Sequence, residues 1–301
     1  MANSTGEDHS KIILMQYFLR SAGAGILILA GLVIQLFIVA VNITDWLKGR
    51  SITEADKIIT SLGVSRILFH LFCLLGLFAV TSLSKSPSIF LILYILIEIS
   101  TYSGVWLSTL LSTFFYFKIS TFHNVFFLRL KAIISKRVTY LILASVLLSL
   151  PYSFVNFVAT FNELLKNSTQ TINADYTKQQ IMSNFHVALN IFPILLFFIA
   201  SALFIILLGF HMSRMNNHGH AMSNTDTYHR TLTFTVFSFL ACAFYVINIL
   251  FQVFMRLLDI FWLCFTINVF PVLHSLLLIY VMTKLRNQFF MIVRCRINCL
   301  L

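Results

Sequence analysis

The chain has 301 residues, of which 59% are hydrophobic and only 10% are charged, and its mean hydropathy is +0.90. This composition excludes an ordinary soluble enzyme or nucleic-acid-binding domain, even though the net charge is +11, and it indicates an integral membrane protein. A helix that crosses a bilayer needs about 20 apolar residues. The chain contains seven such runs, at about 22–44, 58–82, 88–117, 138–160, 187–210, 231–254 and 260–283.

These runs predict an all-α membrane protein, folded as one bundle of seven transmembrane helices. The connecting loops are too short to fold alone, so a single domain is expected over the whole chain. Residues 12–19 are interpreted as an extension of the first helix, and residues 284–301 as a short tail. Pro151, Pro193 and Pro271 fall within predicted helices, where the missing N–H group loosens or kinks the backbone.

Positive charge is unequally divided between the two ends of the predicted bundle. Fourteen Lys and Arg residues lie at one face, against six at the other, and the cation-rich face is expected in the cytosol. The N-terminus is then extracellular and the C-terminus cytosolic. Lys118 marks the cytosolic end of the third helix, where its ammonium reaches the headgroups. Asn167, in the sequence Asn-Ser-Thr after the fourth helix, is a predicted extracellular glycosylation site.

The five cysteines do not suggest a disulfide between the outer loops. Cys73, Cys242 and Cys264 fall within predicted helices and are interpreted as small buried apolar side chains. Cys295 and Cys299 lie in the tail beside two arginines, where palmitoylation is one alternative.

A polar layer is predicted in the middle of the bundle. Arg66 lies nine residues, or about 13 Å, inside the cytosolic end of the second helix. Counting inward along the first and seventh helices places Gln35, His274 and Ser275 at the same depth. No carboxylate is expected there, so we predict that amide, hydroxyl, carbonyl or water groups satisfy the guanidinium. The layer serves as a packing clamp or as a switch that transmits a signal, and the two roles are compatible.

A water-filled cavity is predicted near the outer ends of the helices. Glu98 is the only acidic residue well inside a predicted span, and a carboxylate that faced lipid would be costly. The Glu98 carboxylate is expected to attract a cationic ligand or to pair with a cation in a neighbouring loop. Residues at a similar height predict a mostly apolar, aromatic pocket for small amphipathic molecules, although any one of them could instead pack between helices. The candidates are Glu98, Thr101, Tyr102, Asn184, Phe185, His186, Tyr245, Asn248, Cys264 and Asn268.

The sequence lacks the usual patterns of catalysis. It contains no H-E-x-x-H motif, no phosphate-binding glycine loop and no paired carboxylates within the spans. His211, His218 and His220 could hold a metal ion, but a solvated loop is favoured because no cysteine or carboxylate joins them at ligand spacing. We therefore expect no enzyme, no cofactor, no metal ion and no nucleic-acid partner.

Motifs along the whole chain resemble those of the type 2 (bitter) taste receptors. The stretch WLSTLLSTFFYFKISTFHNVFFLRLK, from Trp106 to Lys131, is similar to that family's third helix and second inner loop. The segments FIVAVNITDW and LGVSR resemble its first two helices. The H-x-x-x-M pattern at His211 and the P-x-x-H-S to K-L-R segment, from Pro271 to Arg286, are also similar. The combination is more specific than any single motif.

Five positions depart from the family's pattern. Gln35 stands in place of an asparagine, Val125 in place of a proline and Phe234 in place of a lysine. Thr101 and Tyr102 replace an asparagine–histidine pair in the pocket. These departures indicate a divergent member, for which a non-mammalian source is one interpretation, and they make the range of ligands unpredictable from relatives.

The resemblance implies a G-protein-coupled receptor in the plasma membrane. Such a receptor would bind small bitter molecules on its outer side and activate a gustducin-like heterotrimeric G protein. G-protein contacts are expected at Lys118, Arg129, Lys131 and His211, where anchoring of the cations to anionic lipid is an equal alternative. A vomeronasal type 1-like chemoreceptor shares the seven-helix plan. A small transporter or channel is an alternative of a different class, which would move solute across liposomes without a G protein.

Overall fold

The described part of the chain is almost entirely helical. The computed structural model describes residues 2–81, 87–119, 125–168, 176–217, 222–255 and 260–300. Helices suit a chain this apolar, since every backbone N–H and C=O group must find its partner within the protein when lipid surrounds it. The nine α-helices of these residues are α1 (Ala2–Leu47), α2 (Glu54–Thr81), α3 (Pro87–Ile119), α4 (Val125–Lys136), α5 (Val138–Ser168), α6 (Tyr176–Asn217), α7 (Met222–Met255), α8 (Ile260–Val281) and α9 (Thr283–Leu300).

The expected all-α membrane fold is confirmed for the described residues. α8 and α9 meet at a bend of 92° and together form one candidate span, from Phe265 to Cys295. With this pair the described residues contain up to seven candidate spans, and without it six. The six unbent candidates are Ser21–Leu47, Glu54–Ala79, Ser88–Ile119, Val138–Val155, Phe192–Phe210 and His229–Ile247.

Two helices lie where the sequence predicted a loop and a tail. α4 has only 12 residues and is too short to cross a bilayer. Its sequence VFFLRLKAIISK alternates apolar residues with cations, as an amphipathic helix does. α9 is similar, with cations among its apolar residues. α1 begins at Ala2, so residues 12–19 continue the first helix as expected.

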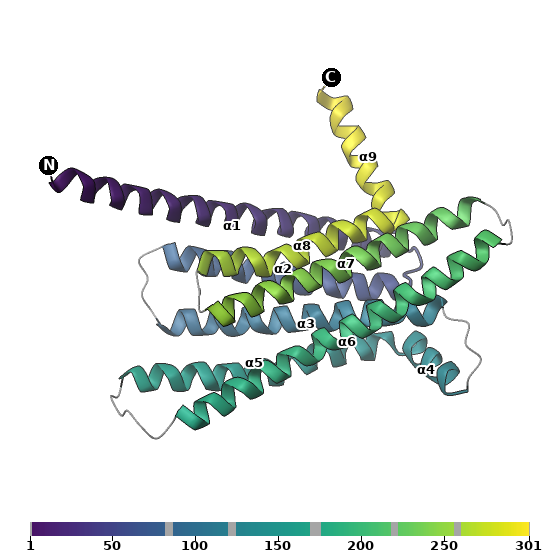
Figure 1. Ribbon diagram of the computed structural model, residues 1–301. Coiled ribbons are helices and arrows are strands. Elements are labelled where there is room, and N and C mark those ends of the chain that lie inside the picture. The colour runs from purple at the N-terminus through teal and green to yellow at the C-terminus, as the bar shows by residue number, and fades with distance from the viewer. Residues whose placement is uncertain are drawn as a thin grey trace.

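The long helices run side by side, and α4 and α9 lie at the same end of the bundle (Figure 1). The largest cluster of buried apolar residues joins α1, α2, α3 and α8 and includes Ile58, Leu62, Leu107, Leu111 and Leu278. Lipid removes most of the hydrophobic force between helices, so they associate through close packing, which small residues at the contacts allow. Buried glycines on three of these helices, Gly31, Gly63 and Gly104, provide such contacts.

The three prolines lie inside helices, as the sequence predicted. Pro151 is in α5, Pro193 in α6 and Pro271 in α8. The carbonyl oxygens of Pro193 and Pro271 each accept a hydrogen bond from a side chain of another helix, at 3.4 Å. The backbone around two of the prolines therefore takes part in contacts between helices.

Candidate functional site

A buried guanidinium lies at the meeting point of α2, α3 and α8. Arg66 of α2 is 3% exposed, although its side chain is charged. Its Nη1 donates to Ser275 Oγ at 2.6 Å and to the Pro271 carbonyl at 3.4 Å, and its Nη2 donates to Ser108 Oγ at 3.1 Å. The acceptors in these three hydrogen bonds are two hydroxyl groups and one backbone carbonyl. Arg66 thereby ties α2 to both α3 and α8.

An imidazole and an aromatic ring complete the surroundings of this cation. Arg66 Nη1 lies 3.2 Å from His274 Nδ1. Because a guanidinium can only donate, this contact requires Nδ1 to be the unprotonated, accepting nitrogen. The guanidinium carbon also lies 6.0 Å from the centre of the Phe270 ring, within range of a cation–π contact. Both residues belong to α8, so this helix carries most of the cation's contacts.

Gln35 of α1 joins the same cluster through a shared hydroxyl. Its Nε2 donates to Ser275 Oγ, which also accepts from Arg66. Gln35, Arg66, His274 and Ser275 are all buried, so the four residues predicted to share one depth lie in one cluster. The amide of Gln35 reaches the guanidinium through Ser275. We refer to these four residues and Ser108 as the Arg66 cluster.

Sequence reasoning missed Ser108. This residue lies ten positions before Lys118 on α3, or about 15 Å of helix, and therefore at the depth of Arg66. The same counting that placed Gln35 and Ser275 could have found it. Its hydroxyl also donates to the carbonyl of Gly104 in its own helix, a local bond that gives no signal in the sequence.

A second buried polar pair joins α2 to α8. His70 Nδ1 and Asn268 Oδ1 are 2.8 Å apart, and both side chains are fully buried. Since the amide oxygen can only accept, Nδ1 of His70 carries the proton. Gly31 of α1 lies against the His70 ring, and a Cβ atom there would come within 2.5 Å of it. Asn268 was a candidate for the ligand cavity, and the structure gives it this helix-to-helix contact.

A small cavity adjoins the Arg66 cluster between α2, α3, α7 and α8. Its walls include Arg66, Phe69, Thr101, Tyr245 and Phe270. The cavity volume is about 30 Å³, which is space for only a few water molecules. A drug-sized ligand is far larger, so it could enter only if these helices moved apart or if it bound beyond this cavity.

The predicted cavity residues fall into three groups. Thr101 and Tyr245 line the cavity. Glu98 and Tyr102 are half-buried on α3, outside its lining. The remaining candidates lie outside the side chains that the structure describes, apart from Asn268 above, and they are Asn184, Phe185, His186, Asn248 and Cys264.

Three of the four predicted G-protein contacts lie on two neighbouring helices, α3 and α4, and His211 lies on α6. Lys118 is exposed in the last turn of α3, and Arg129 is exposed on α4, while Lys131 of α4 is half-buried. The side chains of His211 and Asn167 lie outside the described residues. The loop that contains His218 and His220 also lies outside them.

Comparison with known proteins gives consistent matches. The family model described as "Taste receptor protein (TAS2R)" matches residues 15–296. Taste receptor type 2 member 64 of Pan paniscus is 30% identical over 285 residues, covering 88% of this chain and 89% of that protein. Taste receptor type 2 member 117 of Rattus norvegicus is 29% identical over 276 residues, which is 86% of each chain. Taste receptor type 2 member 123 of Rattus norvegicus is 37% identical over a shorter match of 123 residues, which is 40% of this chain and 37% of that protein.

Proposed function

Because the chain belongs to the taste receptor type 2 family, we propose that it is a bitter taste receptor that binds small bitter molecules and activates a gustducin-like heterotrimeric G protein. The family is one of receptors and implies small-molecule ligands and G-protein coupling in general. The observation that supports the proposal best is the position of the Arg66 cluster, which adjoins a cavity and joins four helices of the bundle.

The proposed topology follows from charge placement. One domain spans the plasma membrane seven times, with the N-terminus outside and the C-terminus in the cytosol. The cation-rich ends of the helices, including Lys118 and Arg129, then face the cytosol. Asn167 faces the outside and is the proposed glycosylation site.

The proposed mechanism begins with expansion of the cavity. It is too small for a bitter molecule, so an agonist that binds there must favour a packing in which α3, α7 and α8 lie further apart. Arg66 lines this cavity and holds Ser108 of α3 and Ser275 of α8. Separating these helices would lengthen its hydrogen bonds. The agonist thereby biases the helix packing at the level of the guanidinium.

The signal would then reach the G protein at the cytosolic ends of α3 and α6 and at α4. Lys118, Arg129, Lys131 and His211 are the proposed contacts. α4 follows α3 directly, so a shift of α3 moves the cations of both helices. Anionic lipid headgroups would attract the same cations when no G protein is bound.

Calcium release in cells tests this function. Cells that display the receptor are exposed to a panel of bitter compounds, with and without a chimeric G protein. We expect at least one compound to raise calcium only when receptor and G protein are both present. A lack of response to every compound, despite verified surface display, would argue against a bitter receptor.

A matched pair of variants tests the role of the cavity. Tyr245→Leu removes an aromatic wall and its hydroxyl, so we expect a higher agonist concentration for half-maximal response. Phe244→Leu is the control, since this neighbouring ring is mostly exposed and is not part of the cavity lining. Equal responses of the two variants would place the agonist elsewhere.

A further inference from the structure

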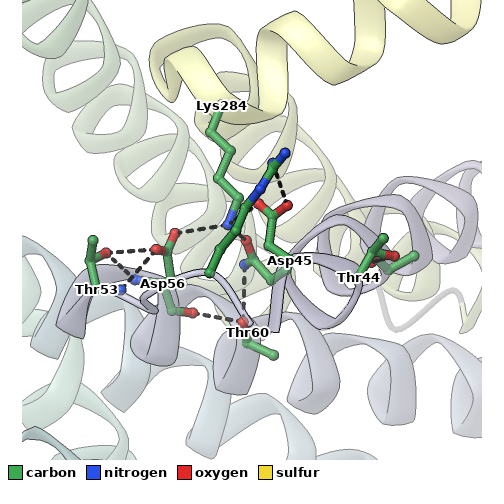
Figure 2. Close-up of polar contacts among 9 residues, drawn as sticks. Thr44, Asp45, Thr53, Asp56, Thr60 and Lys284 are labelled. Carbon is green, nitrogen blue, oxygen red and sulfur yellow. Dashed lines mark hydrogen bonds and ion pairs between the residues drawn. The ribbon is translucent and has the colours of Figure 1, made fainter. Parts of the chain in front are cut away.

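Lys284 lies in the first turn of α9, immediately after the bend from α8. Its Nζ donates to Asn42 Oδ1 at 2.9 Å and lies 3.0 Å from Asp45 Oδ2 and 3.6 Å from Asp56 Oδ1. Asn42 and Asp45 are near the end of α1, and Asp56 is in the first turn of α2. Figure 2 shows the lysine side chain pointing down between the two carboxylates. One ammonium thus links three helices.

The two carboxylates are also held by residues other than Lys284. Asp45 Oδ1 pairs with Arg50 Nη1 at 2.9 Å. Asp56 Oδ2 accepts from the Thr53 backbone N–H at 3.1 Å and from Thr53 Oγ1 at 2.7 Å, which caps the start of α2. Each carboxylate therefore gives one oxygen to a local partner and the other to Lys284 (Figure 2). These local contacts orient the acids for the lysine.

Hydrogen bonds through Thr60 also connect Asn42 of α1 to the start of α2. Asn42 Nδ2 donates to Thr60 Oγ1 at 3.0 Å, and Thr60 Oγ1 donates to the Asp56 carbonyl at 2.7 Å. The side chains of Lys284, Asp45 and Asp56 are only 33%, 14% and 18% exposed. Partial burial reduces screening by water, so removal of the cation would leave two carboxylates close together without their shared partner.

The described side chains of α9 make few other contacts with the bundle. Leu285 is buried in the main apolar cluster, and the ring of Phe289 lies 5.9 Å from that of Phe37 on α1. Beyond this point the apolar residues from Phe289 to Val293 are exposed. Leu285 anchors the start of the helix, and Arg286 donates from its backbone N–H to the Met282 carbonyl and from Nη1 to the Tyr280 carbonyl at 3.4 Å, next to α8. The polar contacts of Lys284 add a connection to the ends of α1 and α2.

The contacts of Lys284 also repeat the connectivity of the Arg66 cluster. Gln35 and Asn42 are seven residues apart on α1, and Arg66 and Asp56 are ten apart on α2. These spacings separate the two polar groups by about 10–15 Å along the helices. α1, α2 and the α8–α9 segment are therefore joined twice, at two depths, by hydrogen bonds and ion pairs.

We propose that Lys284 is a positioning residue that fixes the direction of α9 by binding it to the ends of α1 and α2. The role in signalling rests on the proposed function, because an α9 held in one direction leaves a defined surface for a G protein beside α3 and α4.

Spin-label distance measurements test this proposal without an agonist or a G protein. Labels are placed on cysteines that replace Leu47 at the end of α1 and Ile292 on α9, both at least half exposed. Cys264, Cys295 and Cys299 are replaced by serine, and the purified full chain is reconstituted in lipid nanodiscs. We expect one narrow distance peak for the chain with Lys284 and for Lys284→Arg, which keeps the charge. Lys284→Gln should lose the narrow peak and give a broad distribution.

Arg294→Gln is the matched control, since it removes an exposed cation of α9 that takes no part in the Lys284 contacts. This variant should keep the narrow peak. Asp45→Asn tests the same contact from the α1 side and should broaden the peak even if Lys284→Gln fails to fold. A narrow peak in either the Lys284→Gln or the Asp45→Asn protein would overturn the proposal. Neither outcome depends on whether the chain senses bitter compounds.

Discussion

The Ser275 hydroxyl is the point where three helices share one acceptor. Gln35 of α1 and Arg66 of α2 both donate to it from within a fully buried region. A guanidinium without hydrogen-bond acceptors would be very costly at this depth in a membrane. The hydroxyl groups of Ser275 and Ser108 reduce that cost, and they keep α1, α2, α3 and α8 in one arrangement.

Ser275→Ala should therefore lower stability. The change removes the acceptor of Gln35 Nε2 and the shortest contact of Arg66 Nη1, and a buried donor left without an acceptor costs about 1–3 kcal/mol. Ser149→Ala is the control, because Ser149 is equally buried but its hydroxyl donates to the Val146 carbonyl of its own helix. We expect a clearly larger drop in the unfolding temperature of the purified protein in detergent for Ser275→Ala. Equal drops for the two variants would show that the shared hydroxyl has no special importance.

The close packing of α1 against α2 and α8 depends on Gly31 of α1. Gly31 allows the His70 ring of α2 to lie against the α1 backbone, where that ring also contacts Asn268 of α8. A Cβ atom at Gly31 would lie 2.5 Å from two His70 ring atoms and 2.9 Å from Val272 Cγ2. A rigid ring cannot move aside without breaking its hydrogen bond to Asn268.

Gly31→Ala should destabilise the packing of α1 on α2 and α8. Overpacking of this kind costs about 1–3 kcal/mol. Gly23→Ala is the control in the same helix, because no atom lies within 4 Å of its Cβ position. The unfolding temperature should fall for Gly31→Ala and stay unchanged or rise slightly for Gly23→Ala. An unchanged value for Gly31→Ala would contradict the close contact with His70.

The long helices could be predicted from the sequence, but the two short helices α4 and α9 could not. Seven long apolar runs are visible in the sequence because each exceeds the thickness of a bilayer, and each lies largely within a described helix. α4 and α9 mix cations with apolar residues, and this composition predicts a loop and a tail. Their helical form is recognisable only from amphipathic spacing, which is a weaker signal over 12 or 18 residues.

In the whole molecule, counting residues along the helices predicted which residues share one level of the bundle. It predicted less well which side chains form pairs. The rise of a helix is constant, so Gln35, Arg66, His274 and Ser275 could be assigned to one level from the sequence. Which atoms meet depends also on how each helix is rotated and how closely it packs. For that reason the pairing of His70 with Asn268 was not predicted, and Asn268 was assigned to the cavity.

The distribution of positive charge along the whole chain predicts that the N-terminus lies outside the cell and the C-terminus in the cytosol. An epitope tag at the N-terminus should bind antibody on intact cells, and a tag at the C-terminus only after permeabilisation. Asn167→Gln should remove a glycan and increase gel mobility to that of the enzymatically deglycosylated protein. A C-terminal tag that is accessible on intact cells would reverse the topology and place the cations of α3 and α4 outside.

We propose that Arg66 transmits agonist binding from the cavity to the cytosolic face. The most direct measurement is guanine-nucleotide exchange on a purified G protein, driven by the Arg66→Gln receptor in nanodiscs at a saturating concentration of an agonist from the panel. We expect exchange to fall by about 5- to 150-fold, the range of a typical coupling energy. Leu68→Ala, at an exposed position on the same helix, should leave exchange unchanged. Full exchange by a folded Arg66→Gln receptor would show that Arg66 does not transmit agonist binding.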